Sequence, residues 1–124
     1  MKEKVINFLC LLEGYHQRLK EIHWSTSIKA EHLLTDDIDG SILEYEDKIA
    51  EVSMGIFNTR FGIGDLKTLI PDSKNLKSVL NELENDIFSL RNALENNKKY
   101  VGLQNALDDF TENIEQWKYL ETFK

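Results

Sequence analysis

The sequence predicts an all-α fold, a single four-helix bundle. Apolar residues recur at helical spacing over four stretches of about twenty residues or more. Only six glycines and one proline interrupt 124 residues, so long helices are expected. Neither strand-like alternation nor a glycine-rich phosphate loop competes with this interpretation. At this length, residues 1–124 are expected to form one domain around one core.

The first two predicted helices are separated by a short break. An apolar stripe over residues 5–23 includes His16 and His23 and is interrupted by Trp24-Ser25-Thr26-Ser27. The serine and threonine side chains there are suited to cap a second helix. Apolar spacing then extends that second helix over about residues 28–53.

The last two predicted helices follow one irregular connection, residues 54–73. It holds three glycines and the proline, and a short extra helix is expected over residues 64–69. A third helix runs from residue 72 or 73 to Asn96-Asn97, and a fourth covers about residues 102–121. Such a connection is long enough to traverse the bundle, so we expect the second and third helices to run parallel.

Composition restricts the partners of the chain. Asp and Glu outnumber Lys and Arg by 22 to 15, and the net charge of -7 disfavours a nucleic-acid surface and favours cations. Cys10 is the one cysteine, which excludes an intramolecular disulfide framework and suits a reducing, cytoplasmic setting. We expect it to be a small buried apolar residue. No apolar run is long enough to span a bilayer, so no membrane partner is expected.

The second predicted helix carries the most informative pattern, H-x3-D-x10-D-x3-E, formed by His32, Asp36, Asp47 and Glu51. At about 100° per residue, the three carboxylates lie within about 100° of His32, so all four side chains share one face. Carboxylate and imidazole ligands suit Fe(II), Mn(II) or Zn(II). The alternative is a solvated acidic face without metal.

One chain cannot close a metal site with these four residues. His32 and Asp47 are about 22 Å apart along the helix axis. Ligands of one ion must each come to about 2 Å from it. A metal site built from both ends of the pattern therefore requires a second copy of the chain.

The pattern, preceded by His23-Trp24, resembles the ferroxidase motif of the Dps family, the miniferritins that assemble as hollow shells. Residues 106–121 resemble the last bundle helix of that family. The likeness covers most of the chain and implies a ferritin-like bundle. It also implies a diiron centre at a two-fold interface with these ligands: His23, His32 and Asp36 of one chain facing Asp47 and Glu51 of its partner.

The resemblance further implies a ferroxidase that oxidises Fe(II) with hydrogen peroxide or dioxygen and stores or detoxifies the iron. Zn or Mn are alternative metals. By the same likeness, Trp24 would absorb oxidising equivalents beside the iron, and the chain would form a dimer or a twelve-subunit shell. The two-fold axis would cross the second helix near residues 41 and 42, where Gly40 and Ser41 allow close approach. Direct DNA binding is not expected, because the body is acidic and lacks a Lys/Arg-rich tail.

Two alternatives stay open from the sequence. The interval between His23 and His32 is about three residues shorter than the family pattern, and a tight hairpin would place position 19 level with His32. His16, on the same stripe, is then the substitute first ligand. The other alternative is a structural or protein-interaction bundle that keeps the fold without iron chemistry.

Overall fold

The computed structural model describes residues 1–123 and is all-α. Within this range the helices are α1 (Lys2–Ser25), α2 (Lys29–Phe57), α3 (Leu76–Leu94), the 3-10 turn η1 (Lys98–Tyr100) and α4 (Val101–Glu121). The predicted four-helix bundle with its longer loop between the second and third helices is confirmed.

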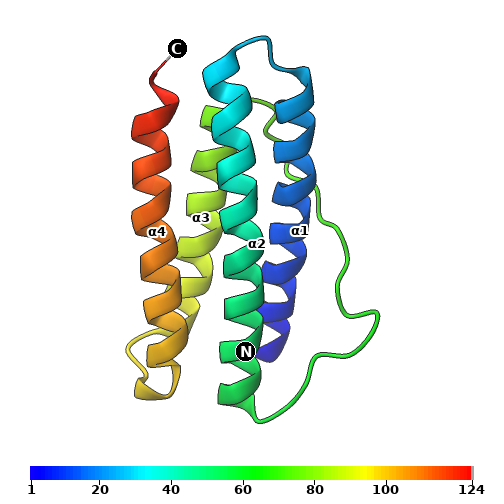
Figure 1. Ribbon diagram of the computed structural model, residues 1–124. Coiled ribbons are helices and arrows are strands. Elements are labelled where there is room, and N and C mark those ends of the chain that lie inside the picture. Colours follow the sequence, from blue (N-terminus) through cyan, green and yellow to red (C-terminus); the bar gives the residue numbers. More distant parts are fainter. Residues whose placement is uncertain (124) are drawn as a thin grey trace.

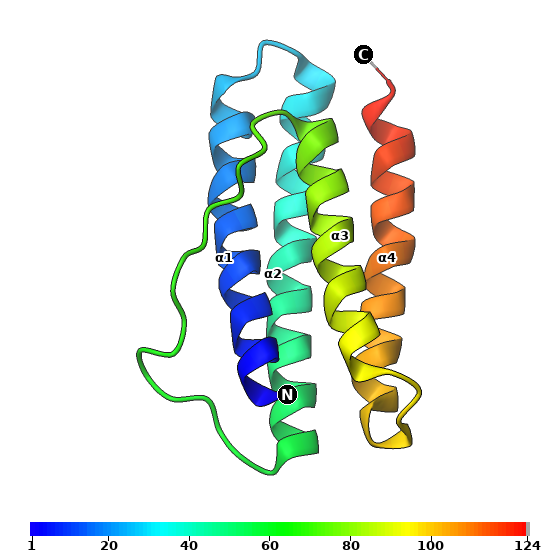
Figure 2. The same ribbon diagram turned by 180° about the vertical axis from the view of Figure 1, so that it is seen from behind.

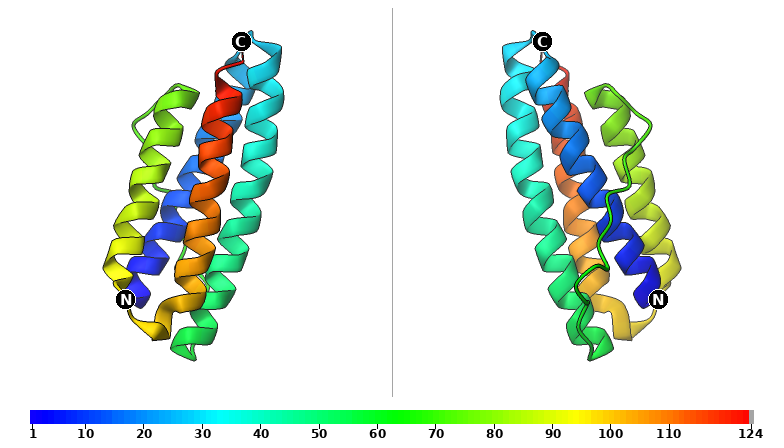
Figure 3. Two further views of the ribbon diagram at one scale, coloured as in Figure 1. Left: turned by 90° about the vertical axis from the view of Figure 1, so that its left-hand side faces the viewer. Right: turned by 90° about the vertical axis from the view of Figure 1, so that its right-hand side faces the viewer.

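Two helical hairpins make up the bundle. α1 and α2 are joined by a short turn at one end, and α3 and α4 are joined through η1 at the other (Figure 1). Between them the chain returns along the outside of α1, from the end of α2 to the beginning of α3 (Figure 2). α2 and α3 therefore run in the same direction, which confirms the expected parallel arrangement (Figure 3). None of the helices within residues 1–123 is both long and apolar enough to cross a membrane.

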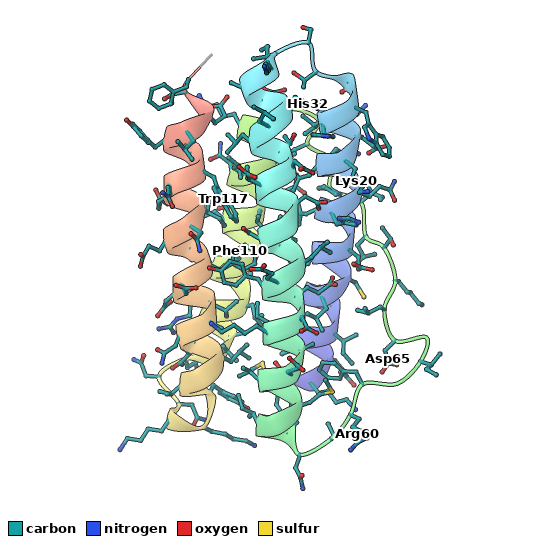
Figure 4. The ribbon with its side chains drawn as sticks, in the orientation of Figure 1. Lys20, His32, Arg60, Asp65, Phe110 and Trp117 are labelled. Atoms are coloured by element: carbon teal, nitrogen blue, oxygen red, sulfur yellow. The ribbon has the colours of Figure 1, made fainter. Side chains whose placement is uncertain are left out.

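The core is filled by the apolar stripe of each helix, because leucine and isoleucine at helical spacing face the bundle axis. Burying each such side chain contributes about 1.5–3 kcal/mol. On the side of α4 the core is aromatic: the Tyr45 and Phe110 rings stack with centroids 4.2 Å apart, and Trp117 meets Phe110 edge to face (Figure 4). The fully buried aliphatic residues include Leu9, Leu12, Leu19, Ile38, Ile42, Ile49, Leu76, Leu80 and Leu83.

The beginning of α2 differs from its prediction. Its N-cap is Ile28, and no side chain caps the helix. The Thr26 hydroxyl instead accepts a hydrogen bond from the Ile28 amide at 3.1 Å, so it stabilises the turn and not the helix end. The predicted serine or threonine cap is therefore wrong.

Two other helix ends also shift. α2 continues past residue 53 to Phe57 and stops at Asn58, whose left-handed backbone (φ 51°, ψ 47°) ends a helix readily. α3 begins later than predicted, because Asn75 is the N-cap and accepts from the Ser78 amide at 3.0 Å. Ser73 lies outside the helix and bonds to Glu82 through both its amide and its hydroxyl.

We call the returning segment, residues 58–75, the strap. The short helix predicted over residues 64–69 is wrong, since the segment is non-helical. Its amides bond to α1 instead: Lys67 N donates to the Cys10 sulfur at 3.2 Å and Leu69 N donates to the Cys10 carbonyl at 3.2 Å. These bonds replace the internal bonds that a helical turn would need. Cys10 is buried beneath the strap, as expected for a small apolar residue.

Gly14 lets the strap lie against α1. A Cβ at this position would come within 1.7 Å of the Leu69 carbonyl oxygen and 2.4 Å of its carbon. Only a residue without a side chain permits this approach.

Candidate metal centre

His23 and His32 lie face to face across the turn that joins α1 and α2. Their ring centroids are 3.7 Å apart and their planes differ by 15°. Each Nδ1 bonds to the other residue's carbonyl oxygen, at 2.6 Å from His23 and 2.7 Å from His32. The Thr35 hydroxyl is 3.3 Å from His23 Nδ1, which adds a third polar contact to the pair. His32 lies at the end of the bundle that carries this turn (Figure 4).

These two bonds determine which ring nitrogen of each histidine can bind a metal ion. A carbonyl oxygen can only accept, so each Nδ1 must carry the hydrogen. In the neutral imidazole, Nε2 then keeps its lone pair. A backbone carbonyl on Nδ1 is also the usual support of a metal-bound histidine. His23 and His32 thus each keep an Nε2 donor on a ring that its Nδ1 bond holds in place.

A cavity of about 130 Å³ adjoins the histidine pair. His23, Trp24 and Lys20 border it from α1, and Asp36 and Asp39 border it from α2. The Lys20 ammonium lies 5.7 Å from the centre of the Trp24 ring, a cation–π distance. Asp36 is exposed and forms no ion pair or hydrogen bond with any of residues 1–123. The cavity therefore combines an imidazole, a carboxylate free to bind a cation, and an exposed indole.

His16 is engaged elsewhere. Its Nδ1 lies 2.5 Å from Asp39 Oδ1, in a part-buried contact between α1 and α2. The structure therefore places His23, and not His16, level with His32. The predicted register, with position 19 opposite His32, is wrong because α1 continues through Ser25. The turn is then centred near residue 27, which brings position 23 opposite position 32.

The other two predicted ligands lie toward the opposite end of α2. Asp47 borders a groove of about 310 Å³ between α1, α2 and the strap. Glu51 borders a neighbouring hollow with Arg60 of the strap. Both carboxylates are exposed, and neither forms an ion pair or hydrogen bond with a described residue. Arg60 and Asp65 of the strap are seen at this end in Figure 4.

A pair of carboxyl groups beside Asp47 escaped the sequence pattern. Burial, a hydrogen bond with Glu13 and the charges of Glu13 and Asp47 together raise the pKa of Glu46 to about 8. One oxygen of Glu46 is buried without a hydrogen-bond partner among the described residues. Glu13 lies on α1 and Glu46 on α2, so no spacing pattern within one helix could predict this pair. The sequence indicated only that the two residues belong to adjacent helices of a hairpin.

The structure divides the predicted ligands into two groups. His23, His32 and Asp36 gather at one end of α2, and Asp47 and Glu51 gather about 22 Å from them by helical rise. Within residues 1–123, no three His, Cys, Asp or Glu side chains are arranged to hold a metal ion. Between the groups, Gly40 has open space where a Cβ would lie, and Leu43 is 39% exposed.

Comparison with protein-family models, with curated proteins and with solved structures finds no match to this chain.

Proposed function

We propose that the chain is a Dps-like ferroxidase that takes Fe(II) as substrate at a site shared by two copies. The observation that carries the proposal is the His23–His32 pair, whose Nδ1 atoms are both bonded to carbonyl oxygens, with the Asp36 carboxylate bordering the same cavity as His23. Two imidazoles with a carboxylate suit Fe(II) and leave coordination positions open for an oxidant. Zn(II) or Mn(II) fit the same donors.

The proposed assembly is a two-fold dimer with α2 packed against α2 of the second copy. An axis near residues 41 and 42 would bring the histidine end of one copy to the Asp47 and Glu51 end of the other. Support comes from the face itself: it carries the exposed carboxylates, the open surface of Gly40 and the partly exposed side chain of Leu43. A twelve-subunit shell is the larger assembly that the Dps resemblance implies.

The proposed reaction transfers electrons from Fe(II) to the oxidant. Two Fe(II) ions each lose one electron, and one hydrogen peroxide accepts both as its O–O bond breaks, which gives two Fe(III) ions and two hydroxide ions. Carboxylates of the two copies offset the additional positive charge of the oxidised product. Trp24 is proposed to intercept oxidising equivalents, since the residue is 71% exposed and borders the same cavity as His23 and Asp36.

The test is the rise of ferric absorbance when peroxide is added anaerobically to protein and Fe(II). His32→Gln and Asp47→Asn are expected to lower the initial rate about tenfold or more, since each removes a donor. Asp37→Asn and Glu44→Gln are the matched controls, because both are exposed on α2 outside the ligand set. Mixing His32→Gln protein with Asp47→Asn protein should restore part of the rate, because one of the two shared sites in a mixed dimer is intact.

A different outcome would favour the bundle as a structural or interaction module. In that case wild-type protein would bind no Fe(II), and light scattering would give the mass of a monomer at every concentration. The acidic face of α2 would then be a solvated surface. Metal bound without any peroxide-dependent rate would instead indicate a Zn(II) or Mn(II) protein.

A further inference from the structure

A groove of about 500 Å³ runs between the first half of α1 and the second half of α3, away from the candidate metal centre. Its apolar walls come from Phe8, Leu11, Leu90 and Ala93, and Asn7 and Ser89 add polar side chains between them. This volume lies within the range of small-molecule sites, which combine apolar walls with few polar groups.

The charged groups of the groove are separated along its length. α1 and α3 run antiparallel (Figure 2), so Asp86 lies toward the Leu11 end, and Glu3 and Lys4 lie toward the Ala93 end. Seven residues of α3 separate Asp86 from Ala93, a helical rise of about 10 Å. A ligand that uses the whole groove is therefore about 10 Å long, with a polar group near Asp86.

Asp86 carries a carboxylate without a counter-ion. Its Oδ2 accepts a 2.5 Å hydrogen bond from the hydroxyl of Tyr15, which is fully buried. Among residues 1–123, no Lys, Arg or His forms an ion pair with it. Burial and the charge of Glu82 raise the pKa of Asp86, against the lowering effect of the Tyr15 bond. A cation placed in the groove would supply the charge that the fold does not.

We propose that the groove binds a small amphiphilic amine, with its ammonium on Asp86 and its apolar chain along the Phe8, Leu11 and Leu90 walls. This site does not depend on the ferroxidase proposal. The ligand is a primary amine because an ammonium can donate to the carboxylate oxygen that Tyr15 does not use.

The test uses 4-phenylbutylamine as the probe and isothermal titration calorimetry with the full chain. Saturable one-to-one binding is expected, and 4-phenylbutan-1-ol and 4-phenylbutyrate should bind about tenfold more weakly or worse, because neither carries the cation. Asp86→Asn should weaken amine binding by a similar factor. Asparagine can still accept the Tyr15 hydrogen bond, so this variant removes the charge and keeps the contact.

Two further variants complete the design. Ala93→Phe fills the far end of the groove and should also weaken the amine, without touching Asp86. Asp72→Asn, an exposed acid outside the groove, should leave binding unchanged. The proposal is overturned if wild-type protein shows no saturation at millimolar amine. It is also overturned if the butyrate binds as tightly, or if the Asp86 and Ala93 variants, shown folded by circular dichroism, bind like wild type.

Discussion

His23 and His32 hold each other in place: each ring donates to the other residue's carbonyl, and the two rings stack at 3.7 Å. Neither histidine is therefore oriented independently of the other. Loss of one ring removes the stack and the bond that this ring made, so the remaining imidazole keeps only its own bond to a backbone carbonyl.

This coupling predicts non-additive losses of metal binding. His23→Gln and His32→Gln should each weaken Co(II) binding, read from its visible spectrum, by about tenfold or more. The double variant should lose far less than the sum of the two free-energy changes, because the pair acts as a unit. Asp37→Asn, an exposed acid on α2 outside the ligand set, is the control. Strictly additive losses would contradict the coupling.

Gly40 distinguishes a lone bundle from the proposed dimer. A Cβ here meets nothing within 4 Å in the chain, so Gly40→Ala should stabilise the monomer by about 0.5–1 kcal/mol through helix propensity. If α2 packs against its copy at this level, the larger Gly40→Leu should instead weaken self-association. Urea unfolding and analytical ultracentrifugation measure the two effects separately. Unchanged association of Gly40→Leu would place the interface elsewhere.

Gly14→Ala is expected to destabilise the chain by about 1–3 kcal/mol, the usual range for overpacking. The added methyl would overlap the Leu69 carbonyl, which is backbone and cannot rotate away. Gly55→Ala is the matched control, since it lies in α2 with nothing within 4 Å of its Cβ. Urea midpoints of the two variants should move in opposite directions. Equal midpoints would mean that the strap moves away from the added methyl group without loss of stability.

Glu46 predicts how stability depends on pH. Its pKa in the folded chain, about 8, is above its ordinary value of 4.5. Between these values the folded chain holds a proton that the unfolded chain has lost, so stability falls as the pH rises from about 4.5 to about 8. Glu46→Gln removes this dependence and should be more stable than wild type at pH 9, with the difference vanishing near pH 4. Urea unfolding between pH 4 and pH 9 measures this difference in stability. Glu44→Gln, at an exposed position, is the control.

The helices followed from the sequence because their stripes are long and regular, whereas the register of the α1–α2 hairpin did not. Apolar spacing cannot say whether Trp24 and Ser25 still belong to α1, since both are exposed. That small shift in the turn decides whether His23 or position 19 faces His32. The pairing of Nδ1 with carbonyl oxygens is likewise a tertiary contact that no spacing pattern encodes.

The strap was mispredicted for a related reason. Residues 64–69 have helical spacing, yet the amides of Lys67 and Leu69 bond to Cys10, more than fifty residues earlier. Tertiary contacts override local propensity when they satisfy the backbone equally well. The carboxylates Asp36, Asp47 and Glu51 were easier to place, because helical geometry alone puts them on one face.

The position of Cys10 beneath the strap also gives the protein a natural reporter. Cys10 is 5% exposed and its sulfur accepts a hydrogen bond from the Lys67 amide, so we expect a thiol reagent to reach it when the strap lifts from α1. A chain with a single cysteine yields a single labelling signal. The rate of that signal measures how often the connection between the two hairpins opens, without any probe having to be introduced.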